Sequence, residues 1–385
     1  MKNNSSLVRQ HKFILLVGDH YNPLGIVRSL GRAGIKPIVV LVASKSHFVA
    51  KSRYVGKLHY VKSKEEGLEL IIDKYSNEKK HPFIYTGSDD IESLIDLNYN
   101  RLIQHFYFWN AGEQGRVTEI MAKKVQCDIA RECGINVPKS EVVSVGELPR
   151  TLSYPIMTKS IISTMENWKC NVHICYNENE LKEAYKNIVG EKILLQEYVE
   201  KVNELCLDVI SLKDGDELYI PIQVKYIRMS NESYGAYMRY EYYSEPALFE
   251  KMKELYKKLR YNGISCIEFL IDKNNEFHFL EVNLRNSGWS YGMTDCGENL
   301  PLIWAESVLA GELDISSVSL KPLPRTGIVE PEDYFNSVKT GEISFYQWLK
   351  NCISADMRYY FSWRDPMPFL CTIFSGVRNR IKKRL

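Results

Sequence analysis

Residues 264–283 read Ile-Ser-Cys-Ile-Glu-Phe-Leu-Ile-Asp-Lys-Asn-Asn-Glu-Phe-His-Phe-Leu-Glu-Val-Asn, two apolar runs around a polar break, which is typical of a β-hairpin. A two-residue turn at residues 274–275 is expected, because asparagine tolerates the positive φ that such a turn needs. Counting outward from this turn places Glu268 directly opposite Glu281. Side chains alternate between the two faces of a strand, so Asn283 shares a face with both glutamates.

Two facing glutamates need an explanation, because like charges directly opposed on a sheet repel each other. A divalent cation between them would turn that repulsion into a binding site. Two carboxylates and an amide oxygen are hard ligands, suited to Mg²⁺ that carries nucleotide phosphates. Glu268, Glu281 and Asn283 are therefore candidate metal ligands. The alternative is a solvated sheet face, which is the ordinary place of charged residues.

The bulk composition indicates a globular cytoplasmic protein of two or three domains. Of its 385 residues, 45% are apolar and 25% are charged. A formal net charge of +2 gives no case for a nucleic-acid partner. No apolar run is long enough for a membrane span, and the first residues lack the apolar core of a signal peptide. The nine cysteines include no Cys-x-x-Cys pair, which argues against zinc and against a disulfide framework.

Alternating strand and helix patterns in the first part of the chain predict a parallel sheet covered by helices. The expected strands are short apolar runs at residues 12–17, 35–42 and 83–86. Ligands of such sheets bind beyond the carboxyl ends of the strands, where Asp19, His20, Ser88 and Asp89 are found. The turn after the first strand lacks the glycine-rich dinucleotide fingerprint, so a nicotinamide enzyme is disfavoured.

Taken in order, residues 12–310 resemble the ATP-grasp ligases. The likeness is strongest at Phe279-Leu-Glu-Val-Asn-Leu-Arg285, which matches the family's Glu-x-Asn-Pro-Arg signature except that Leu284 replaces the proline. The resemblance implies an α/β protein that begins with a parallel-sheet pre-ATP-grasp domain. The implied units are this domain at residues 1–115, an α+β ATP-grasp domain at 116–312, with nucleotide between 116–192 and 193–312, and a small C-terminal segment at 313–385.

By this resemblance, the two glutamates and the asparagine of the hairpin hold the magnesium ions, usually two, that bridge the ATP phosphates. Mn²⁺ is an expected substitute for Mg²⁺. Arg285 would touch the γ-phosphate or the acyl phosphate, because a planar guanidinium suits phosphate oxygens. Lys225 or Arg228 is a further phosphate-binding candidate, and the sequence does not choose between them.

The resemblance also implies a nucleotide site. Residues 195–199, Leu-Gln-Glu-Tyr-Val, resemble the family's adenine-binding hinge. Glu204, seven residues after Glu197, occupies the position of the family's ribose-binding acid. The loop at residues 160–171 contains no glycine, whereas many members place a glycine-rich loop over the phosphates. The expected nucleotide-binding residues are Lys123, Lys159, Lys169, Gln196, Glu197, Tyr198, Val199 and Glu204.

Within the family, the glycine-free loop and residues 286–297 look most like the D-aspartate ligase group of carboxylate–amine ligases. Such enzymes use ATP to convert a carboxylate into an acyl phosphate, from which an amine displaces phosphate to form an amide. We therefore expect a small carboxylate and a small amine as substrates, amino acids among them. The family is often dimeric, so a homodimer is a further expectation.

Two other functions fit the same pattern. One is a carboxylase or carbamoyl-phosphate-type enzyme that activates bicarbonate, although those enzymes usually keep the glycine-rich loop. The other is a nucleotide-binding sensor or scaffold without catalysis, which the altered loop and Leu284 leave open. The retained acids, asparagine and arginine of the hairpin weigh against a pure scaffold.

The end of the chain carries apolar residues at helical spacing followed by a basic cluster. The apolar residues are Leu370, Ile373, Phe374, Val377 and Ile381, and the cations are Arg378, Arg380, Lys382, Lys383 and Arg384. A basic amphipathic helix can lie on an anionic membrane surface, which makes peripheral membrane contact one hypothesis. The alternative is a packed C-terminal helix whose basic end is solvated.

Overall fold

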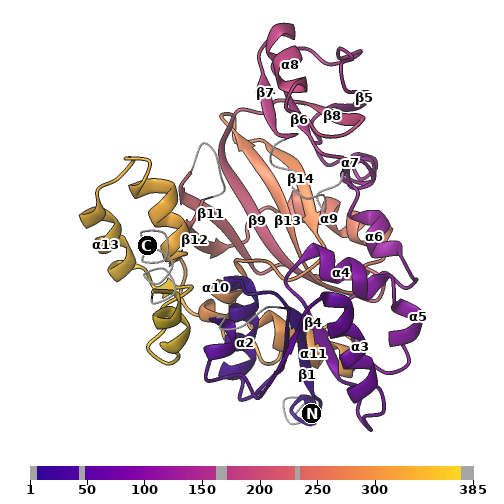
Figure 1. Ribbon diagram of the computed structural model, residues 1–385, viewed down its shortest axis with the longest axis vertical. Coiled ribbons are helices and arrows are strands. Elements are labelled where there is room, and N and C mark those ends of the chain that lie inside the picture. The colour runs from indigo at the N-terminus through magenta and orange to yellow at the C-terminus, as the bar shows by residue number, and fades with distance from the viewer. Residues whose placement is uncertain (1–6, 43–47, 162–170, 230–234, 374–385) are drawn as a thin grey trace.

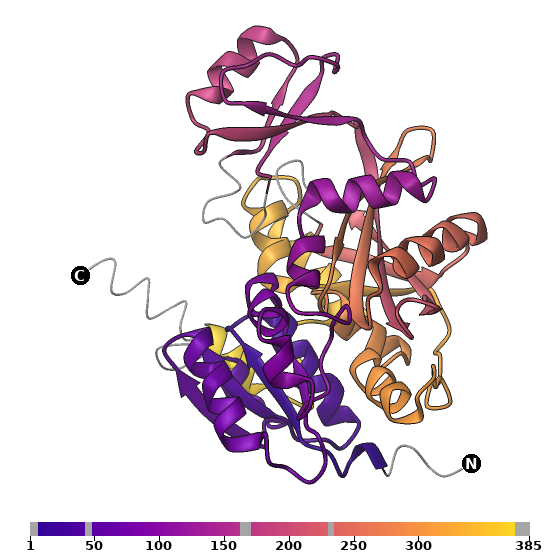
Figure 2. The same ribbon diagram turned by 90° about the vertical axis from the view of Figure 1, so that its right-hand side faces the viewer.

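The computed structural model describes residues 7–42, 48–161, 171–229 and 235–373. Figure 1 shows three sheets in a row along the longest axis, with the parallel sheet at the bottom, a large sheet in the middle and a small sheet at the top. Figure 2 shows the same order after a turn of 90°. Lys169 and most of the predicted basic helix lie outside the described residues.

The first domain contains the predicted parallel sheet, in the order β3-β2-β1-β4. Its strands are β1 (Phe13–Val17), β2 (Ile38–Val42), β3 (Lys57–Val61) and β4 (Phe83–Tyr85), and its helices are α2 (Tyr21–Arg32), η1 (Val49–Lys51), α3 (Lys64–Tyr75), α4 (Asp89–Asp96) and α5 (Tyr99–Leu102). Helices cover both faces of β1, because Phe13 and Leu15 belong to the core around α2, whereas Ile14 and Leu16 belong to the core around α3 and α4. Burial on both faces accounts for the unbroken apolar run of this strand.

The small sheet is antiparallel, in the order β5-β8-β6-β7. After α6 (Arg116–Ile120) and α7 (Lys123–Glu132), its elements are β5 (Ser140–Ser144), β6 (Ile156–Lys159), β7 (His173–Cys175), α8 (Glu178–Tyr185) and β8 (Lys192–Glu197). We call this sheet and α8 the small lobe. Ile156, Leu181 and Ile193 form a core of its own, separate from the main core. The small lobe can therefore move as a unit relative to the large sheet.

The large sheet runs β14-β13-β9-β11-β12-β15-β16, and β10 pairs with β9. Its strands are β9 (Lys201–Leu212), β10 (Glu217–Tyr219), β11 (Ile222–Arg228), β12 (Tyr237–Tyr242), β13 (Gly263–Asp272), β14 (Phe277–Asn283), β15 (Arg325–Ile328) and β16 (Met357–Arg358). Helix α9 (Pro246–Leu259) packs on one face, where Tyr256 bonds to Ser265 at 2.6 Å. Helices α10 (Ser290–Cys296) and α11 (Leu300–Ala310) follow the hairpin.

The C-terminal segment is built into the rest of the molecule. Its strands β15 and β16 extend the large sheet, and α12 (Glu330–Asp333), η3 (Tyr334–Val338) and α13 (Phe345–Ser354) lie between them. The buried Arg28 of α2 forms an ion pair with Asp365 at 3.0 Å. Within the described ranges, no helix combines the length and the apolar character needed to cross a bilayer.

Candidate functional site

The β13–β14 hairpin places Glu268 opposite Glu281, as predicted, but the predicted turn is wrong by one residue. The turn has three residues, closed by the N–H of Asp272, which donates to the carbonyl of Glu276 at 3.2 Å. The Asp272 carboxylate accepts two backbone N–H groups of the turn at 2.9 Å each, which stabilises the longer form. A β-bulge then leaves Leu280 without a register partner and restores the pairing of the two glutamates.

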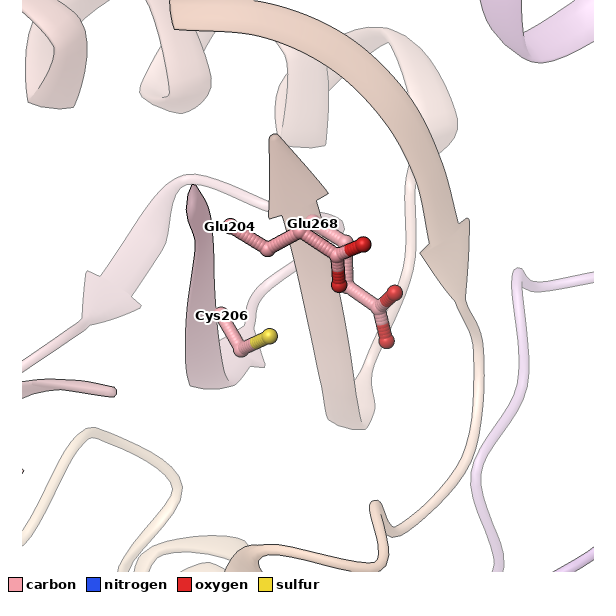
Figure 3. Close-up of side chains that lie close together, drawn as sticks. All are labelled: Glu204, Cys206 and Glu268. Atoms are coloured by element: carbon pink, nitrogen blue, oxygen red, sulfur yellow. The ribbon is translucent and has the colours of Figure 1, made fainter. Parts of the chain in front are cut away.

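Three carboxylates gather on the face of the large sheet that is opposite to α9. Cys206 on β9 is the register partner of Glu268, and Glu204 lies two residues before Cys206. One ligand atom from each of Glu204, Cys206 and Glu268 lies within 4.8 Å of the other two. Figure 3 shows the carboxyl groups of Glu204 and Glu268 side by side. Glu281 joins them from the edge strand, and the Asn283 amide donates to Glu268 at 3.1 Å and to Glu281 at 3.4 Å.

The two opposed glutamates differ in their affinity for protons. Burial raises the pKa of Glu268 to about 8, with a further contribution from the neighbouring carboxylates, Glu281 first. Burial also acts to raise the pKa of Glu281, but Lys123 and Lys159 outweigh it, so that this pKa is lowered. Lys123 Nζ lies 3.5 Å from Glu281 Oε2. Without a cation, the pair therefore retains a proton on Glu268 at neutral pH.

The chemistry of the cluster fits a hard divalent cation. Glu204, Glu268 and Glu281 supply carboxylate oxygens, the donors that Mg²⁺ prefers. Asn283, whose amide nitrogen faces Glu268 and Glu281 here, would supply its oxygen after the amide turns over. Burial raises the pKa of the Cys206 thiol well above its ordinary value, so the sulfur stays protonated and is a poor ligand for Mg²⁺. The sequence assigned Glu204 to a ribose, whereas the structure places it beside Glu268 within the acidic cluster.

Two lysines and a glutamine lie beside the acidic cluster, Lys159 and Gln196 in the small lobe and Lys123 at the start of α7. Lys159 on β6 donates to the side-chain oxygen of Gln196 on β8 at 2.7 Å. Burial and the nearby Lys123 lower the pKa of Lys159 to about 8. Both lysines are attracted to Glu281 of the large sheet. This attraction links the small lobe and α7 to that sheet. The structure thus brings together three of the predicted nucleotide-binding residues.

The predicted adenine hinge joins the small lobe to the large sheet, because β8 ends at Glu197 and β9 begins at Lys201. Tyr198 and Val199 are half-buried in this connection. The exposed Glu197 side chain accepts from the backbone N–H of Lys139 at 3.3 Å. Leu195 and Gln196 are the buried members of the hinge, and Glu197 lies on its outer side.

Helix α7 is fastened to the edge strand β14 by a residue that the sequence analysis missed. The Gln126 amide donates to the Val282 carbonyl at 2.7 Å and accepts from the Val282 N–H at 2.8 Å. The Gln126 side chain thus takes the place of a neighbouring strand in pairing with the Val282 backbone. The two bonds also fix α7 so that Lys123 lies next to Glu281. An interior helix position gave no cue to this contact in the sequence.

The two further phosphate-binding candidates, Lys225 and Arg228, have different surroundings in the structure. Lys225 is the register partner of Leu205, so it lies on the face of the sheet opposite to the acidic cluster. Arg228 donates to the buried Asp333 at 2.7 Å. The sequence placed both cations on the correct strand, but the face of Lys225 depends on the strand register. The partner of Arg228 comes from far along the chain.

Arg285 connects the acidic cluster with the first domain. Its guanidinium forms an ion pair with Asp89 at the start of α4, with Nε 3.1 Å from Oδ1. It also donates to the Asn283 side-chain oxygen at 3.2 Å. Arg285 thus lies between the candidate metal ligands and the carboxyl ends of the parallel strands.

A cavity of about 830 Å³ lies beyond the carboxyl ends of the parallel strands, and Arg285 forms part of its wall. Charged residues of both signs line it, among them Asp19, Lys64 and Asp89. His20 caps α2 by accepting from Asn22 N at 3.2 Å, and burial together with Arg285 lowers its pKa to about 4. His20 is therefore neutral at physiological pH, and its cap role agrees with the simpler expectation for a turn histidine.

No protein-family profile matches the chain. Among curated proteins, it is similar to the mitochondrial propionyl-CoA carboxylase alpha chain of Homo sapiens, with 22% identity over 200 residues. This match covers 48% of the chain and 26% of that protein. The chain thus spans about a quarter of the length of the curated relatives that it matches.

Solved structures match far more of the chain. The ADP complex of N5-carboxyaminoimidazole ribonucleotide synthetase has a TM-score of 0.65 at 15% identity, covering 86% of this chain and 84% of that chain. The L-amino acid ligase from Bacillus licheniformis has a TM-score of 0.62 at 14% identity, with coverages of 82% and 78%. At these identities the likeness shows the fold. The predicted α/β architecture is confirmed.

Proposed function

We propose that the chain is an ATP-dependent ligase that joins a carboxylate to an amine through an acyl phosphate. The observation that carries this proposal is the position of Arg285, between the acidic cluster on one side and the cavity of the first domain on the other. A protein that only bound nucleotide would have no need for this bridge. Phosphoryl transfer depends mostly on positioning and charge, so no nucleophilic side chain is required.

The nucleotide would lie between the small lobe and the large sheet. Glu268, Glu281 and Asn283 would hold Mg²⁺, with Glu204 beside them, and the bound ion would neutralise charge on the phosphates during transfer. Lys123 and Lys159 would meet the phosphates as cations. Because burial disfavours the charged form of Lys159, an anionic ligand would stabilise that form and raise the pKa of Lys159.

The surroundings of Arg285 support the following order of steps in the proposed reaction. Arg285 would orient the substrate carboxylate for attack on the terminal phosphorus and then contact the acyl phosphate. The small lobe, which has its own core and a short hinge, would close over the site and exclude water from this intermediate. An amine in the cavity would then attack the acyl carbon and release phosphate.

We propose an amino acid as one of the substrates. The cavity carries Asp19 and Asp89 as well as Lys64 and Arg285, a mixture that complements the ammonium and carboxylate groups of a zwitterion. The likeness of the glycine-free loop to the D-aspartate ligase group supports an acidic amino acid among the candidates. A volume of about 830 Å³ also leaves room for a second, larger substrate.

A bicarbonate-activating carboxylase is the second candidate. The observation in its favour is the sequence similarity to a carboxylase alpha chain over nearly half of the chain. Such an enzyme would consume ATP in response to bicarbonate rather than to an amino acid.

The test measures phosphate release from ATP and Mg²⁺ with a panel of L- and D-amino acids, with simple amines and with bicarbonate. Release that requires one amino acid and one amine supports the ligase, and release with bicarbonate alone supports the carboxylase. ATP binding without turnover on the whole panel would contradict both and favour a sensor or scaffold.

Charge-neutral variants of the hairpin sharpen this test. We expect Glu268→Gln and Glu281→Gln each to lower kcat/KM at least about a hundredfold, since electrostatic stabilisation of transferred charge has effects of this order. Glu276→Gln, at the exposed tip of the same hairpin, is the matched control and should retain activity. Equal losses in all three variants would indicate a general effect on the hairpin and not a metal site.

A further inference from the structure

Four large apolar side chains near the C-terminus are exposed to solvent. Their exposed fractions are 82% for Trp363, 52% for Met367, 39% for Leu370 and 46% for Ile373. The last three lie on the outward face of a helix that begins at Met367. A helix that served only to pack would turn this stripe inward. We call these four residues the C-terminal apolar surface.

The C-terminal apolar surface rests on a firm support. The Phe361 ring packs edge-on against Trp363, with centroids 4.7 Å apart, and against Phe369 at 5.3 Å. Asp365, which lies between Trp363 and the helix, is fixed by its buried ion pair with Arg28 of the first domain. The exposed side chains are thus presented by a rigid part of the fold.

A cavity of about 290 Å³ adjoins this surface, and Trp363 is part of its lining. The remaining charged lining is predominantly cationic, with four cations and two acids. The cations are Arg32, Lys321, Arg358 and Arg364, and the acids are Asp295 and Asp356. Asp295 pairs with the two cavity cations Arg32 at 3.2 Å and Lys321 at 3.6 Å, and also with Arg325 at 2.9 Å, so one acid is shared by three cations and the lining keeps a positive balance. An anionic group would be attracted to this cavity.

The sequence beyond the described residues continues the same character. Residues 366–385 contain five lysines and arginines and no acid. Phe374, Val377 and Ile381 follow Leu370 and Ile373 at helical spacing. In the sequence, the apolar surface is therefore followed by a basic and apolar stretch.

We propose that the C-terminal apolar surface, together with the cationic cavity, binds an anionic phospholipid membrane. Trp363, Leu370 and Ile373 would enter the boundary between headgroups and acyl chains, and the cations would contact the headgroup phosphates. Contact with a second copy of the chain is the less favourable alternative, because an isologous contact would bring two strongly basic segments together. This proposal does not depend on the proposed ligase activity.

The test is co-sedimentation of the full chain, without nucleotide, with vesicles of phosphatidylcholine alone or of phosphatidylcholine and phosphatidylglycerol. We expect binding to the anionic vesicles only. We also expect it to weaken when the salt concentration rises from about 0.1 M to about 0.5 M, because salt screens exposed charges. Equal binding to both vesicles, or no binding to either, would overturn the proposal.

Paired substitutions locate the binding surface. Leu370→Glu with Ile373→Glu should weaken vesicle binding at least tenfold, whereas Leu349→Glu with Ile353→Glu, at exposed apolar positions of α13, should not. Arg380→Gln with Lys383→Gln should weaken it about 30-fold, since each basic residue near an anionic surface contributes about a fivefold factor. Equal losses in the two glutamate pairs would overturn the proposal.

Sedimentation in the absence of lipid separates the remaining alternative. If the wild type forms dimers that the Leu370→Glu, Ile373→Glu pair dissociates, and if it binds no vesicles, the surface is a contact between copies and the proposal fails. Phosphate release in lipid-free buffer is measured on the same samples. Vesicle binding and ATP turnover can therefore fail or succeed independently of each other.

Discussion

At the scale of single residues, the site combines buried charges that are costly in the absence of a ligand. Lys159 is the clearest example, because burial lowers its pKa from 10.5 to about 8. Between these two values the unfolded chain holds a proton that the folded chain lacks. The free energy of unfolding should therefore rise with pH across this window, as far as Lys159 contributes to it.

Lys159→Met should stabilise the nucleotide-free protein and weaken ATP binding. Removal of a buried cation relieves a desolvation cost, and we expect a gain on the order of 1 kcal/mol in the free energy of unfolding at neutral pH. Urea denaturation and ATP titration measure the two effects. Lys182→Met, at an exposed position of α8, is the control and should change neither quantity. A less stable Lys159→Met variant that binds ATP normally would contradict this prediction.

The candidate metal residues could be predicted because side-chain alternation along a strand is a local property. Glu281 and Asn283 share a face whatever the turn does. The pairing of Glu281 with Glu268 depended on a turn length that the sequence misjudged, and it survived because the bulge at Leu280 offsets the extra turn residue. The sequence contained no cue to that compensation.

At the scale of secondary-structure elements, the site depends on the docking of α7 against β14. Among the residues that the structure describes, Gln126 is the one residue of α7 whose side chain bonds to the β14 backbone. Both bonds go to Val282. This contact also covers the exposed edge of the sheet, where an unpaired strand would otherwise invite association.

Gln126→Ala should loosen α7 and raise the KM for ATP. It leaves a buried N–H and a buried carbonyl of Val282 without partners, which costs about 1–3 kcal/mol. Hydrogen exchange of the Val282 amide should quicken, and this measurement distinguishes the local effect from global unfolding. Lys124→Ala, on the exposed side of the same helix, should leave the exchange rate of that amide unchanged. Unaltered exchange in Gln126→Ala would show that the strand does not need the helix.

Elements with strong periodicity were predictable, and contacts between distant elements were not. Three of the four parallel strands followed from apolar patterns alone, whereas β3 was not predicted. Lys225 was assigned to the site because the sequence does not give the register between its strand and β9. That register decides on which face of the sheet Lys225 lies. Arg228 was assigned there because Asp333, its partner, lies 105 residues away in the sequence.

At the scale of the whole molecule, the C-terminal segment is a structural part of the first domain as much as of the large sheet. Arg28 reaches it through its ion pair with Asp365 and through bonds to the carbonyls of Tyr359 at 2.7 Å and Tyr360 at 2.9 Å. The Glu330 carboxylate also accepts backbone N–H groups of this segment. The sequence predicted a small C-terminal segment but not these contacts, because nothing local identifies Arg28 as buried.

Arg28→Met should destabilise the protein by about 3–5 kcal/mol, since it leaves the buried Asp365 carboxylate without its counter-ion. Chemical denaturation measures the loss. Arg32→Met, four residues further along the same helix, removes a partly exposed ion pair and should cost about 1 kcal/mol or less. Similar losses in the two variants would show that Asp365 is stabilised by its other partners, which include Ser52.

The ion pair between Arg285 and Asp89 has a consequence for substrate choice. In the free protein, Asp89 occupies the guanidinium at 3.1 Å. A substrate must offer Arg285 a negative charge that is at least as well placed as that of Asp89. Otherwise the ion pair between Arg285 and Asp89 persists. Uncharged molecules of suitable size would thus be turned away before any ATP is spent, and admission would be governed by an exchange of partners rather than by shape.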